Sequence, residues 1–298
     1  MPELPEVETI RRDLARKIVG KKIISVEVRD HRVAKGNLVK ILRGQKFARI
    51  ERRGKLLAFL LSDGRYLLTH LKMTGQLIYL SSPRKRGSAA DSRSESGMTI
   101  AAGGHKISAG DLQVPNKFTR VIFTFTDKSQ LFFNDMRRFG YMKIVNKKEK
   151  ERIWQEDFGI EPLTKSFKFK DFVELFKNHK INIKALLMNQ KLIAGIGNIY
   201  ADEACWCAGL LPWRKVSGLK SAETKKLFNC ITHVLEVALQ NRGTSFDDFV
   251  DAQGEKGGHY NFLKVYERDG AKCRRCGNII KKTRHAGRGT HYCPGCQH

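Results

Sequence analysis

The stretch CRRCGNIIKKTRHAGRGTHYCPGC, residues 273–296, contains four cysteines in the spacing C-x2-C-x16-C-x2-C. Two close pairs separated by a short connection are typical of a tetrahedral zinc site. Four thiolates would complete the coordination and leave no position for a catalytic water, so the ion would be structural. The predicted ligands are Cys273, Cys276, Cys293 and Cys296. A histidine could replace one of them, and the candidates for this lesser alternative are His285, His291 and His298.

Between the cysteine pairs lies NIIKKTRHAGRGTHY, residues 278–292, whose alternating basic pattern predicts a β-hairpin. Arg288 lies at the glycine-flanked tip, where a guanidinium could reach a phosphate or a DNA groove. In the alternative interpretation, this is a zinc ribbon whose charges merely face solvent. Because the rest of the chain is also basic, we favour contact with DNA.

The whole chain is strongly basic. Its 298 residues include 56 Lys and Arg against 30 Asp and Glu, which gives a formal net charge of +26. Each phosphate contact releases counterions, so nucleic acid is favoured as a partner over an ordinary basic enzyme or a ribosome-associated protein. Hydrophobic residues make up 41 % of the chain, which argues against disorder. The sequence contains no apolar run of about 18 residues, so it predicts no membrane span. Its acidic first residues do not resemble a secretory signal. A cytosolic protein is expected.

Apolar spacing predicts a β-rich first domain, residues 1–146, with one leading helix. Residues 5–19 place Val7, Ile10, Leu14 and Ile18 on one helical stripe. Short β-like runs follow from residue 21 onward, and SDG at 62–64 predicts a hairpin turn. Residues 83–112 are rich in Ser, Gly, Ala and charge, and we expect a long mobile loop inserted between strands there.

We expect residues 147–263 to form a second, helical domain and residues 264–298 to form the zinc finger. The last long helical pattern begins at Ser221, a candidate N-cap. A glycine-rich, loop-like segment follows at 241–261 and could move. Three further cysteines lie in apolar, helix-like sequence and are interpreted as buried free thiols: Cys205, Cys207 and Cys230.

The chain opens MPELPEVETIRR, residues 1–12, with carboxylates crowded at one end of a basic protein. Methionine before proline is usually removed, which would expose Pro2 as a secondary amine and a nucleophile. A model α-amino pKa of about 8 leaves a neutral fraction at pH 7, and the positive end of the following helix would disfavour the ammonium form. Glu3 and Glu6 would act in the opposite direction on this pKa, but a carboxyl beside a nucleophile can transfer protons. In the alternative interpretation, they are ordinary helix-capping glutamates.

Five motifs occur in the order seen in formamidopyrimidine-DNA glycosylases of the Fpg/Nei group: PELPEVETIRR, HLKMTG, DMRRFG, GIGNIYADEA and the four-cysteine finger. The chain resembles this family over almost its whole length, apart from residues 83–112. The resemblance implies an α+β multidomain fold with an N-terminal β-sandwich and its leading helix, a helix–two-turn–helix domain and a zinc finger. It also implies a monomer that acts on damaged double-stranded DNA, with one structural zinc and no catalytic metal or organic cofactor.

The implied reaction is excision of oxidised purines, 8-oxoguanine and formamidopyrimidines, followed by lyase cleavage. In this family the terminal proline, here Pro2, attacks C1′ of the damaged nucleotide. The base leaves, an iminium forms, and β- and δ-eliminations cut the strand on both sides of the lost sugar. Glu3 matches the acid/base glutamate and Glu6 a supporting glutamate. Lys55 matches a β-hairpin lysine that assists catalysis and contacts phosphate; without the resemblance it would be interpreted as a solvated charge.

An everted base leaves a gap that side chains must fill. Met73, Arg137 and Phe139 match the family's intercalating residues, although Met and Phe in strands would otherwise indicate core packing. DMRRFG departs from the commoner DPRRFG only at Met136. The other predicted DNA-binding residues are His70 and Lys184 near phosphate, Asn198 at a helix start, and Lys256 and Tyr260 in the loop that closes over the base.

Two alternatives remain open at this point. One is a Nei-type glycosylase for oxidised pyrimidines, although LPEVE and RRFG favour the purine branch. The other is a non-enzymatic zinc-finger protein that binds nucleic acid and leaves every duplex intact.

Overall fold

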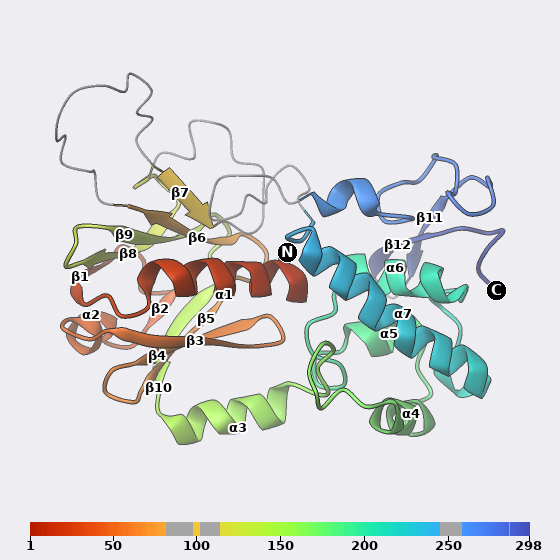
Figure 1. Cartoon of the computed structure of the whole chain (residues 1–298), viewed down its shortest axis with the longest axis horizontal. Coiled ribbons are helices and arrows are strands. Elements are labelled where there is room, and N and C mark those ends of the chain that lie inside the picture. The colour runs from red at the N-terminus through yellow and green to blue at the C-terminus, as the bar shows by residue number, and fades with distance from the viewer. Residues whose placement is uncertain (82–97, 102–113, 245–257, 286) are drawn as a thin grey trace. The chain divides into compact units, whose positions relative to one another are not determined.

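The computed structural model describes residues 1–81, 98–101, 114–244, 258–285 and 287–298. Within them the chain forms two compact units (Figure 1). The first comprises Met1–Pro2, Glu6–Glu151 and Thr244. The second comprises Glu3–Pro5, Arg152–Gly243 and Gly258–His298. The first turn of the leading helix therefore contributes residues to both units.

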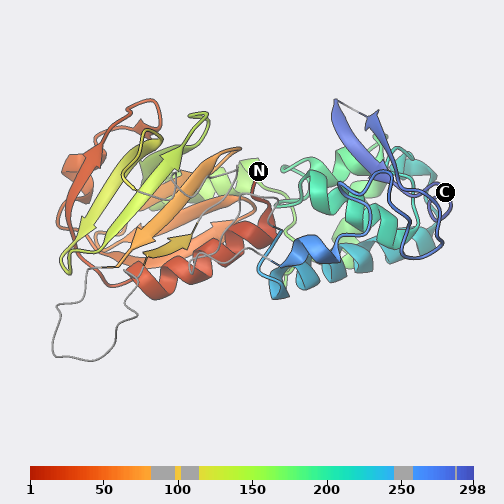
Figure 2. The same ribbon diagram turned by 90° about the horizontal axis from the view of Figure 1, so that it is seen from above.

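Two five-stranded sheets and the leading helix form most of the first unit. Helix α1 (Leu4–Ile18) lies alongside the sheets (Figures 1 and 2) and ends before Gly20, whose φ of +83° suits glycine. One sheet has the order β1 (Ile23–Val28), β8 (Thr119–Phe125), β9 (Gln130–Asp135), β6 (Gly75–Leu80) and β7 (Met98–Ala101). The other has the order β2 (Ala34–Lys35), β10 (Tyr141–Val145), β5 (Tyr66–His70), β4 (Leu56–Leu61) and β3 (Phe47–Arg53).

The core of this unit is filled from both sheets and from α1, which confirms the predicted sandwich with a leading helix. The apolar stripe that predicts the helix is at most 1 % exposed, and its members are Val7, Ile10, Leu14 and Ile18. They share one cluster with Phe47 of β3 and Phe123 of β8, whose ring centres lie 6.1 Å apart. Because each buried Leu or Ile contributes about 1.5–3 kcal/mol, this stripe is enough to hold the helix on the sheets.

Three local features test the predicted strand pattern. Residues 62–64 form the turn between β4 and β5, with Gly64 at φ +84°, as predicted. Helix α2 (Leu38–Leu42) was not expected; the Asn37 side chain caps it by accepting a backbone N–H of its first turn at 3.1 Å. Strand β7 lies inside residues 83–112, so the expectation of a continuous loop is wrong for its four residues. The remainder of that segment, with its predicted mobility, lies outside the described residues.

Helices form most of the second unit, as predicted. They are α4 (Phe169–Lys177), α5 (Ile183–Met188), α6 (Asn198–Ala208) and α7 (Ser221–Gln240), with α3 (Lys147–Asp157) before them. Ser221 is the first residue of α7 and not its N-cap, because the Glu223 carboxylate accepts the Lys220 N–H at 2.8 Å. Two short 3-10 helices are Val216–Gly218 and η3 (His259–Phe262), and an antiparallel hairpin is formed by β11 (Lys281–His285) and β12 (Arg288–Tyr292).

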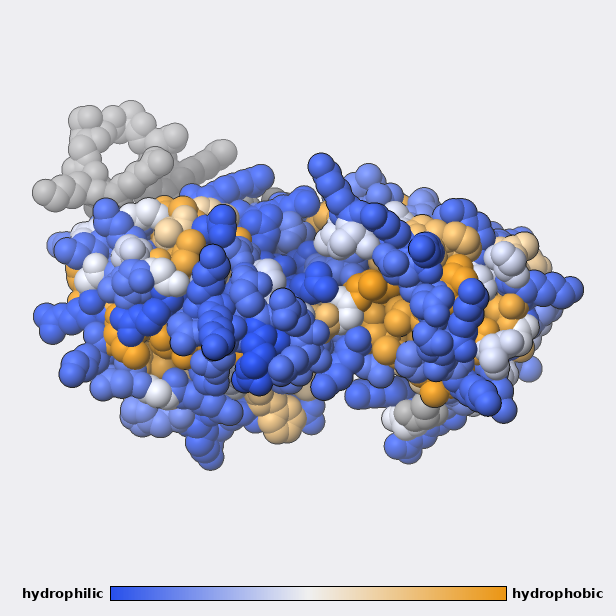
Figure 3. Space-filling model, turned by 90° about the horizontal axis from the view of Figure 1, so that it is seen from below, coloured by the Kyte–Doolittle hydropathy of each residue, from blue (hydrophilic) through white to orange (hydrophobic). Residues whose placement is uncertain are grey.

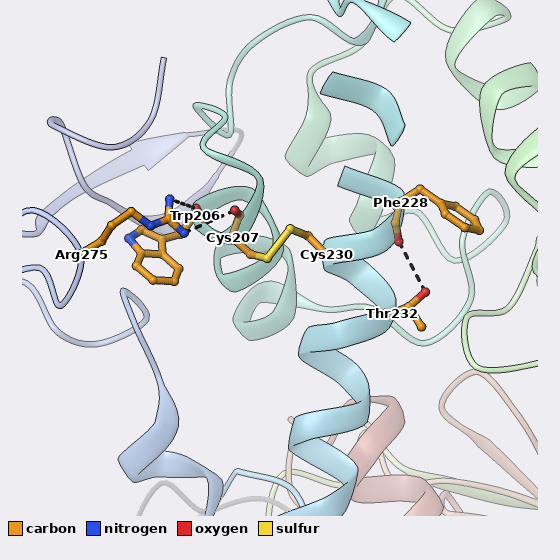
Figure 4. The surroundings of a disulfide bond; sticks show 6 residues. All are labelled: Trp206, Cys207, Phe228, Cys230, Thr232 and Arg275. Carbon is orange, nitrogen blue, oxygen red and sulfur yellow. Dashed lines mark hydrogen bonds between the residues drawn. A yellow bond between two sulfur atoms is a disulfide. The ribbon is translucent and has the colours of Figure 1, made fainter. Parts of the chain in front are cut away.

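Cys207 of α6 and Cys230 of α7 form a disulfide, with their Cα atoms 5.7 Å apart (Figure 4). The prediction of free thiols is therefore wrong for this pair, whereas Cys205 is a buried free thiol. Local sequence shows only that each cysteine lies in an apolar helix; the packing of α6 against α7 brings these two together. Figure 4 also shows Arg275 stacked on Trp206, 4.0 Å from the ring centre, where it donates hydrogen bonds to the carbonyl oxygens of Trp206 and Cys207.

Surface composition agrees with the sequence. None of the helices in the described part of the chain is both long and apolar enough to span a membrane. Figure 3 shows a face on which hydrophilic side chains predominate and hydrophobic ones form smaller patches. This distribution matches a chain in which charged residues make up 29 % of the sequence.

Candidate active site and DNA-binding residues

The amino-terminal stretch holds the predicted nucleophile. Met1 is 46 % exposed, and Pro2 is buried. Helix α1 begins at Leu4, whose N–H donates to the Gly195 carbonyl oxygen at 3.0 Å. Removal of Met1 would therefore leave a secondary amine two residues before the positive end of a helix.

Glu3 lies at the start of α6. Its side chain is buried, and its carboxylate accepts the N–H groups of Gly197 at 2.6 Å and Ile199 at 2.9 Å. The start of a helix has unpaired N–H groups and partial positive charge, so a buried carboxylate is stabilised there. A Cβ at residue 197 would lie 2.4 Å from the Glu3 carboxyl carbon, so glycine allows the carboxylate to approach the backbone this closely. Glu3 is thus a capping residue, but for α6 and not for its own helix.

Glu6 is also buried and binds backbone. Its Oε1 accepts the Thr244 N–H at 2.8 Å. Thr244 is the last described residue before 245–257, so this carboxylate fixes the point at which that segment begins. Lys256, a predicted contact to the everted base, lies outside the described residues.

The structure brings Lys55 and His70 together. Lys55 follows Gly54, at φ +55°, in the turn between β3 and β4, and the next residue, Leu56, pairs with His70 of β5. Burial lowers the pKa of His70 to about 3, and the charges of Lys72 and Lys55 act in the same direction. His70 Nδ1 accepts the Lys72 N–H at 2.9 Å, so the neutral ring carries its proton on Nε2, where it can donate to a phosphate oxygen.

Glu8 and Arg52 support the Lys55 turn, and sequence reasoning missed both. Arg52 donates through Nε to Glu8 at 3.0 Å and through Nη1 to the Gly54 carbonyl oxygen at 2.9 Å. Burial would raise the pKa of Glu8, but hydrogen bonds and charges of Arg11 and Arg52 outweigh it and lower the pKa to about 2. The local spacing of Glu8 and Arg11 indicates an ion pair on α1, but nothing local indicates the partner on β3.

The three predicted intercalating residues lie at the same end of the first unit. Met73 is half-buried in the turn between β5 and β6, whereas Arg137 and Phe139 are exposed after β9. Arg137 lies over the Phe139 ring, 5.6 Å from its centre, while Arg138 forms an ion pair with Asp30 at 3.4 Å. Of the two adjacent arginines, Arg137 is thus the one directed to the exposed aromatic ring.

Lys184 is an internal residue of the second unit. It is 2 % exposed, and its ammonium contacts Asp202 at 2.6 Å, the Gly289 carbonyl oxygen at 2.9 Å and Thr290 at 2.9 Å. Two of these contacts are hydrogen bonds, and the contact with Asp202 is a buried ion pair. Lys184 thus holds β12 against α5 and α6, and its predicted contact with phosphate stays a prediction.

The remaining DNA-binding candidates separate into two places. Asn198, at the start of α6, donates to the Gly289 carbonyl oxygen at 3.1 Å, so it lies beside the hairpin that carries the exposed Arg288. Tyr260 lies in η3 and is 47 % exposed. The structure therefore brings Asn198 and the Arg288 hairpin together, and Tyr260 belongs to a different element.

The four predicted zinc ligands converge. Their Sγ atoms lie within 4.8 Å of one another, and no histidine belongs to this group in the part of the chain that is described. The Cys273–Cys296 and Cys276–Cys293 sulfurs are 3.8 and 3.4 Å apart. A tetrahedron with zinc–sulfur bonds of about 2.3 Å has edges of about 3.8 Å, so the four thiols fit the ion. The predicted thiolate set for one structural zinc is confirmed.

The chain thus combines a β-sandwich, a helical unit and a four-thiolate zinc module, and each of these parts matches a known family of domains. Residues 1–142 match the formamidopyrimidine-DNA glycosylase N-terminal domain, and residues 158–249 match the H2TH domain of that enzyme. Residues 270–298 match the zinc finger found in FPG and IleRS. The chain belongs to the formamidopyrimidine-DNA glycosylase family.

Individual relatives agree over their full length. The formamidopyrimidine-DNA glycosylase of Carboxydothermus hydrogenoformans is 38 % identical, with 100 % of both chains covered. The Lactococcus lactis Fpg in a complex with abasic-site DNA has a TM-score of 0.82 and 32 % identity, with 99 % of both chains covered. A MutM structure in complex with DNA containing carbocyclic 8-oxo-G has a TM-score of 0.82 and 33 % identity, again over 99 % of both chains.

Proposed function

We propose that this protein is a bifunctional DNA glycosylase and AP lyase that removes 8-oxoguanine and formamidopyrimidines and then cuts the DNA strand. As a member of its family it is a DNA glycosylase of base excision repair that acts on oxidised purines. The observation that carries the proposal is the full-length family match, with Pro2 and Glu3 at its first positions. The relatives bound to abasic and 8-oxoguanine-type DNA support both steps of the reaction.

In the proposed mechanism Pro2 is the nucleophile. After loss of Met1 its nitrogen attacks C1′ of the damaged nucleotide, and the bond from C1′ to the base breaks. The C1′–O4′ bond then breaks as O4′ takes a proton, which opens the sugar and leaves an iminium between Pro2 and C1′. This iminium withdraws electrons from the opened sugar, so a β-elimination releases the 3′ phosphate and a δ-elimination releases the 5′ phosphate. The nearby start of α1 favours the neutral, reactive form of this amine.

Glu3 moves protons in this scheme, and Lys55 assists. Glu3 follows the nucleophile directly in the chain, and its buried carboxylate is held by two backbone N–H groups in a defined position. Lys55 lies beside His70, and together they present an ammonium and a neutral imidazole N–H to phosphate. Glu6 supports the site by holding Thr244.

DNA binding has two parts in this proposal. Met73, Arg137 and Phe139 enter the duplex and fill the gap left by the everted base. Asn198 and Arg288 act at the backbone on the other unit, with zinc holding the hairpin that carries Arg288. We further propose that the protein acts as a monomer in the cytoplasm, as expected for a repair enzyme with bacterial relatives.

Borohydride reduction during reaction with an 8-oxoguanine duplex tests the proposal. We expect a covalent protein–DNA adduct that maps to Pro2, because borohydride reduces the iminium to a stable amine. Pro2→Gly should weaken trapping, and Glu3→Gln should abolish base release while DNA binding persists. Active protein that retains Met1 would contradict the mechanism, because Pro2 would then have no free amine.

The same reaction separates the alternatives. A Nei-type enzyme would excise thymine glycol in preference to 8-oxoguanine opposite cytosine, so the two duplexes are compared at equal enzyme concentration. A non-enzymatic zinc-finger protein would bind both duplexes with salt-dependent affinity and leave them uncut.

A further inference from the structure

Two connections between strands lie next to each other at one end of the first unit. The turn between β5 and β6 contains Lys72 at φ +50°, and the connection between β9 and β10 contains Arg138 at φ +59°. Non-glycine residues rarely adopt such values, and they persist where surrounding contacts hold the backbone in place. The predicted intercalating residues are their immediate neighbours: Met73 in one connection, and Arg137 and Phe139 in the other.

Asp135 holds the second connection through its side chain. It is 0 % exposed at the end of β9, where its Oδ2 accepts the Gly140 N–H at 2.7 Å and its Oδ1 accepts the Arg137 N–H at 3.2 Å. One carboxylate therefore binds both ends of the connection. A side chain at residue 140 is excluded, because a Cβ there would lie 2.9 Å from the His70 carbonyl oxygen and 3.0 Å from Asp135 Oδ2.

Thr74 joins the two connections. Gly75 of β6 pairs with Asp135 of β9, so Thr74 lies beside the end of β9. Its buried hydroxyl donates to Asp135 Oδ1 and accepts the Arg137 N–H at 3.0 Å. One hydroxyl and one carboxylate thus bind the turn that carries Met73 to the connection that carries Arg137.

We propose that Thr74 and Asp135 are positioning residues for base eversion, because they lock the two connections into one rigid wedge. This inference rests on the proposed function, in which Met73, Arg137 and Phe139 enter the duplex. A wedge that displaces a stacked base must resist the force of restacking, and side chains on loosely held turns would yield. Hydrogen bonds from backbone N–H groups to a buried carboxylate are charge-assisted, which suits them to this task.

Thr74→Val removes the hydroxyl and preserves the shape of the side chain. We expect single-turnover excision of 8-oxoguanine from a duplex to slow by roughly 10²-fold, the effect of about 1 Å of misplacement. Cleavage of a single-stranded abasic oligonucleotide, which has no base stack to open, should stay within about twofold of the wild-type rate. Asp135→Asn should show the same difference between substrates, and Thr74→Ser should recover most of the excision rate because it restores the hydroxyl.

Thr69→Val is the matched control. Thr69 lies in β5 and is 0 % exposed, and its hydroxyl has no hydrogen-bond partner among the described residues. Loss of this hydroxyl should leave excision unchanged. Eversion itself is followed by the fluorescence of 2-aminopurine placed next to the lesion, which rises as stacking is lost. The rise should be slower in Thr74→Val and unchanged in Thr69→Val.

Equal excision rates and fluorescence traces in wild type and Thr74→Val would overturn the inference. A parallel loss of single-stranded cleavage would also overturn it, since that result indicates general damage and not a role in eversion. Wild-type protein that opens the duplex but releases no 8-oxoguanine would instead refute the proposed function. In that case the fluorescence comparison still decides the inference.

Discussion

Replacing Gly197 by alanine tests whether the Glu3 carboxylate must lie at the start of α6. Gly197 has φ −129° and ψ −152°, an extended conformation open to alanine, so the added methyl group is the whole perturbation. Its Cβ would lie 2.4 Å from both the carboxyl carbon and Oε1 of Glu3, about 1 Å short of ordinary van der Waals contact. The carboxylate must therefore move away from the N–H groups of Gly197 and Ile199.

The expected cost comes from the two hydrogen bonds that this movement breaks. A hydrogen bond to a charged group contributes about 1.5–3 kcal/mol, and water replaces part of what is lost, so we expect a destabilisation of about 3 kcal/mol. For a domain of 150–250 residues this corresponds to a Tm lower by roughly 6–12 °C. Excision of 8-oxoguanine should fall roughly 10²-fold, because the displaced carboxylate is the proposed proton-transfer group.

Scanning calorimetry and single-turnover excision measure the two effects. Gly218→Ala is the control in the same unit, because a Cβ there would meet no atom within 4 Å, and it should change stability by less than about 0.5 kcal/mol. A Gly197→Ala protein with the wild-type Tm and excision rate would refute the placement of Glu3. A lower Tm with full excision would show that the carboxylate caps α6 without serving catalysis.

Three further predictions follow from the electrostatics and covalent links. The lowered pKa of Glu8, about 2 against 4.5, means that its stabilisation is fully present above pH 4.5 and lost as the pH falls through about 2. Glu8→Gln should therefore lower the free energy of unfolding by about 2 kcal/mol at pH 7, after allowance for solvent screening, and by less at pH 3, both measured by urea unfolding. Equal losses at the two pH values would contradict the lowered pKa. Reduction of Cys207–Cys230 should destabilise the oxidised protein by about 3 kcal/mol, the value for a loop of this length, and the double serine variant should not respond to reductant. Arg288→Ala should lower the slope of log affinity against log salt by about 1, whereas Lys184→Met should leave the slope unchanged because its ammonium is internal. A reduced slope for Lys184→Met would instead support the predicted phosphate contact.

The sequence predicted those helices and strands whose structure depends mainly on their own residues. The stripe from Val7 to Ile18 identifies α1, and the short, mostly apolar runs of β4 and β5 identify buried strands. Helix α2 was missed because it is five residues long and its start depends on one cap, at Asn37. Strand β7 was missed because it forms only by pairing with β6.

In the candidate site, too, the sequence predicted features that one local motif contains and missed those that depend on distant contacts. The cysteine spacing predicted the zinc ligands because the motif contains the whole coordination set. The partners of Glu3 lie 194 and 196 residues away in the chain, and no local pattern contains that information. Lys184 was assigned to phosphate from the family resemblance, and no local pattern predicted its contacts with Asp202 and Thr290, which depend on how α5, α6 and β12 pack.

The carboxylates at the start of this basic chain share one physical role. Glu3 and Glu6 are both 2 % exposed; Glu3 accepts two backbone N–H groups of a distant segment, and Glu6 accepts the N–H of Thr244. A buried carboxylate is stable only when such donors replace its water, and an N–H left without an acceptor costs a comparable amount. Glutamine at residue 3 would keep one acceptor oxygen, but its NH2 group would face one of the two backbone N–H donors. The carboxylates of Glu3 and Glu6 are therefore held in place by backbone hydrogen bonds, and in the proposed mechanism this fixed position is what allows Glu3 to transfer protons.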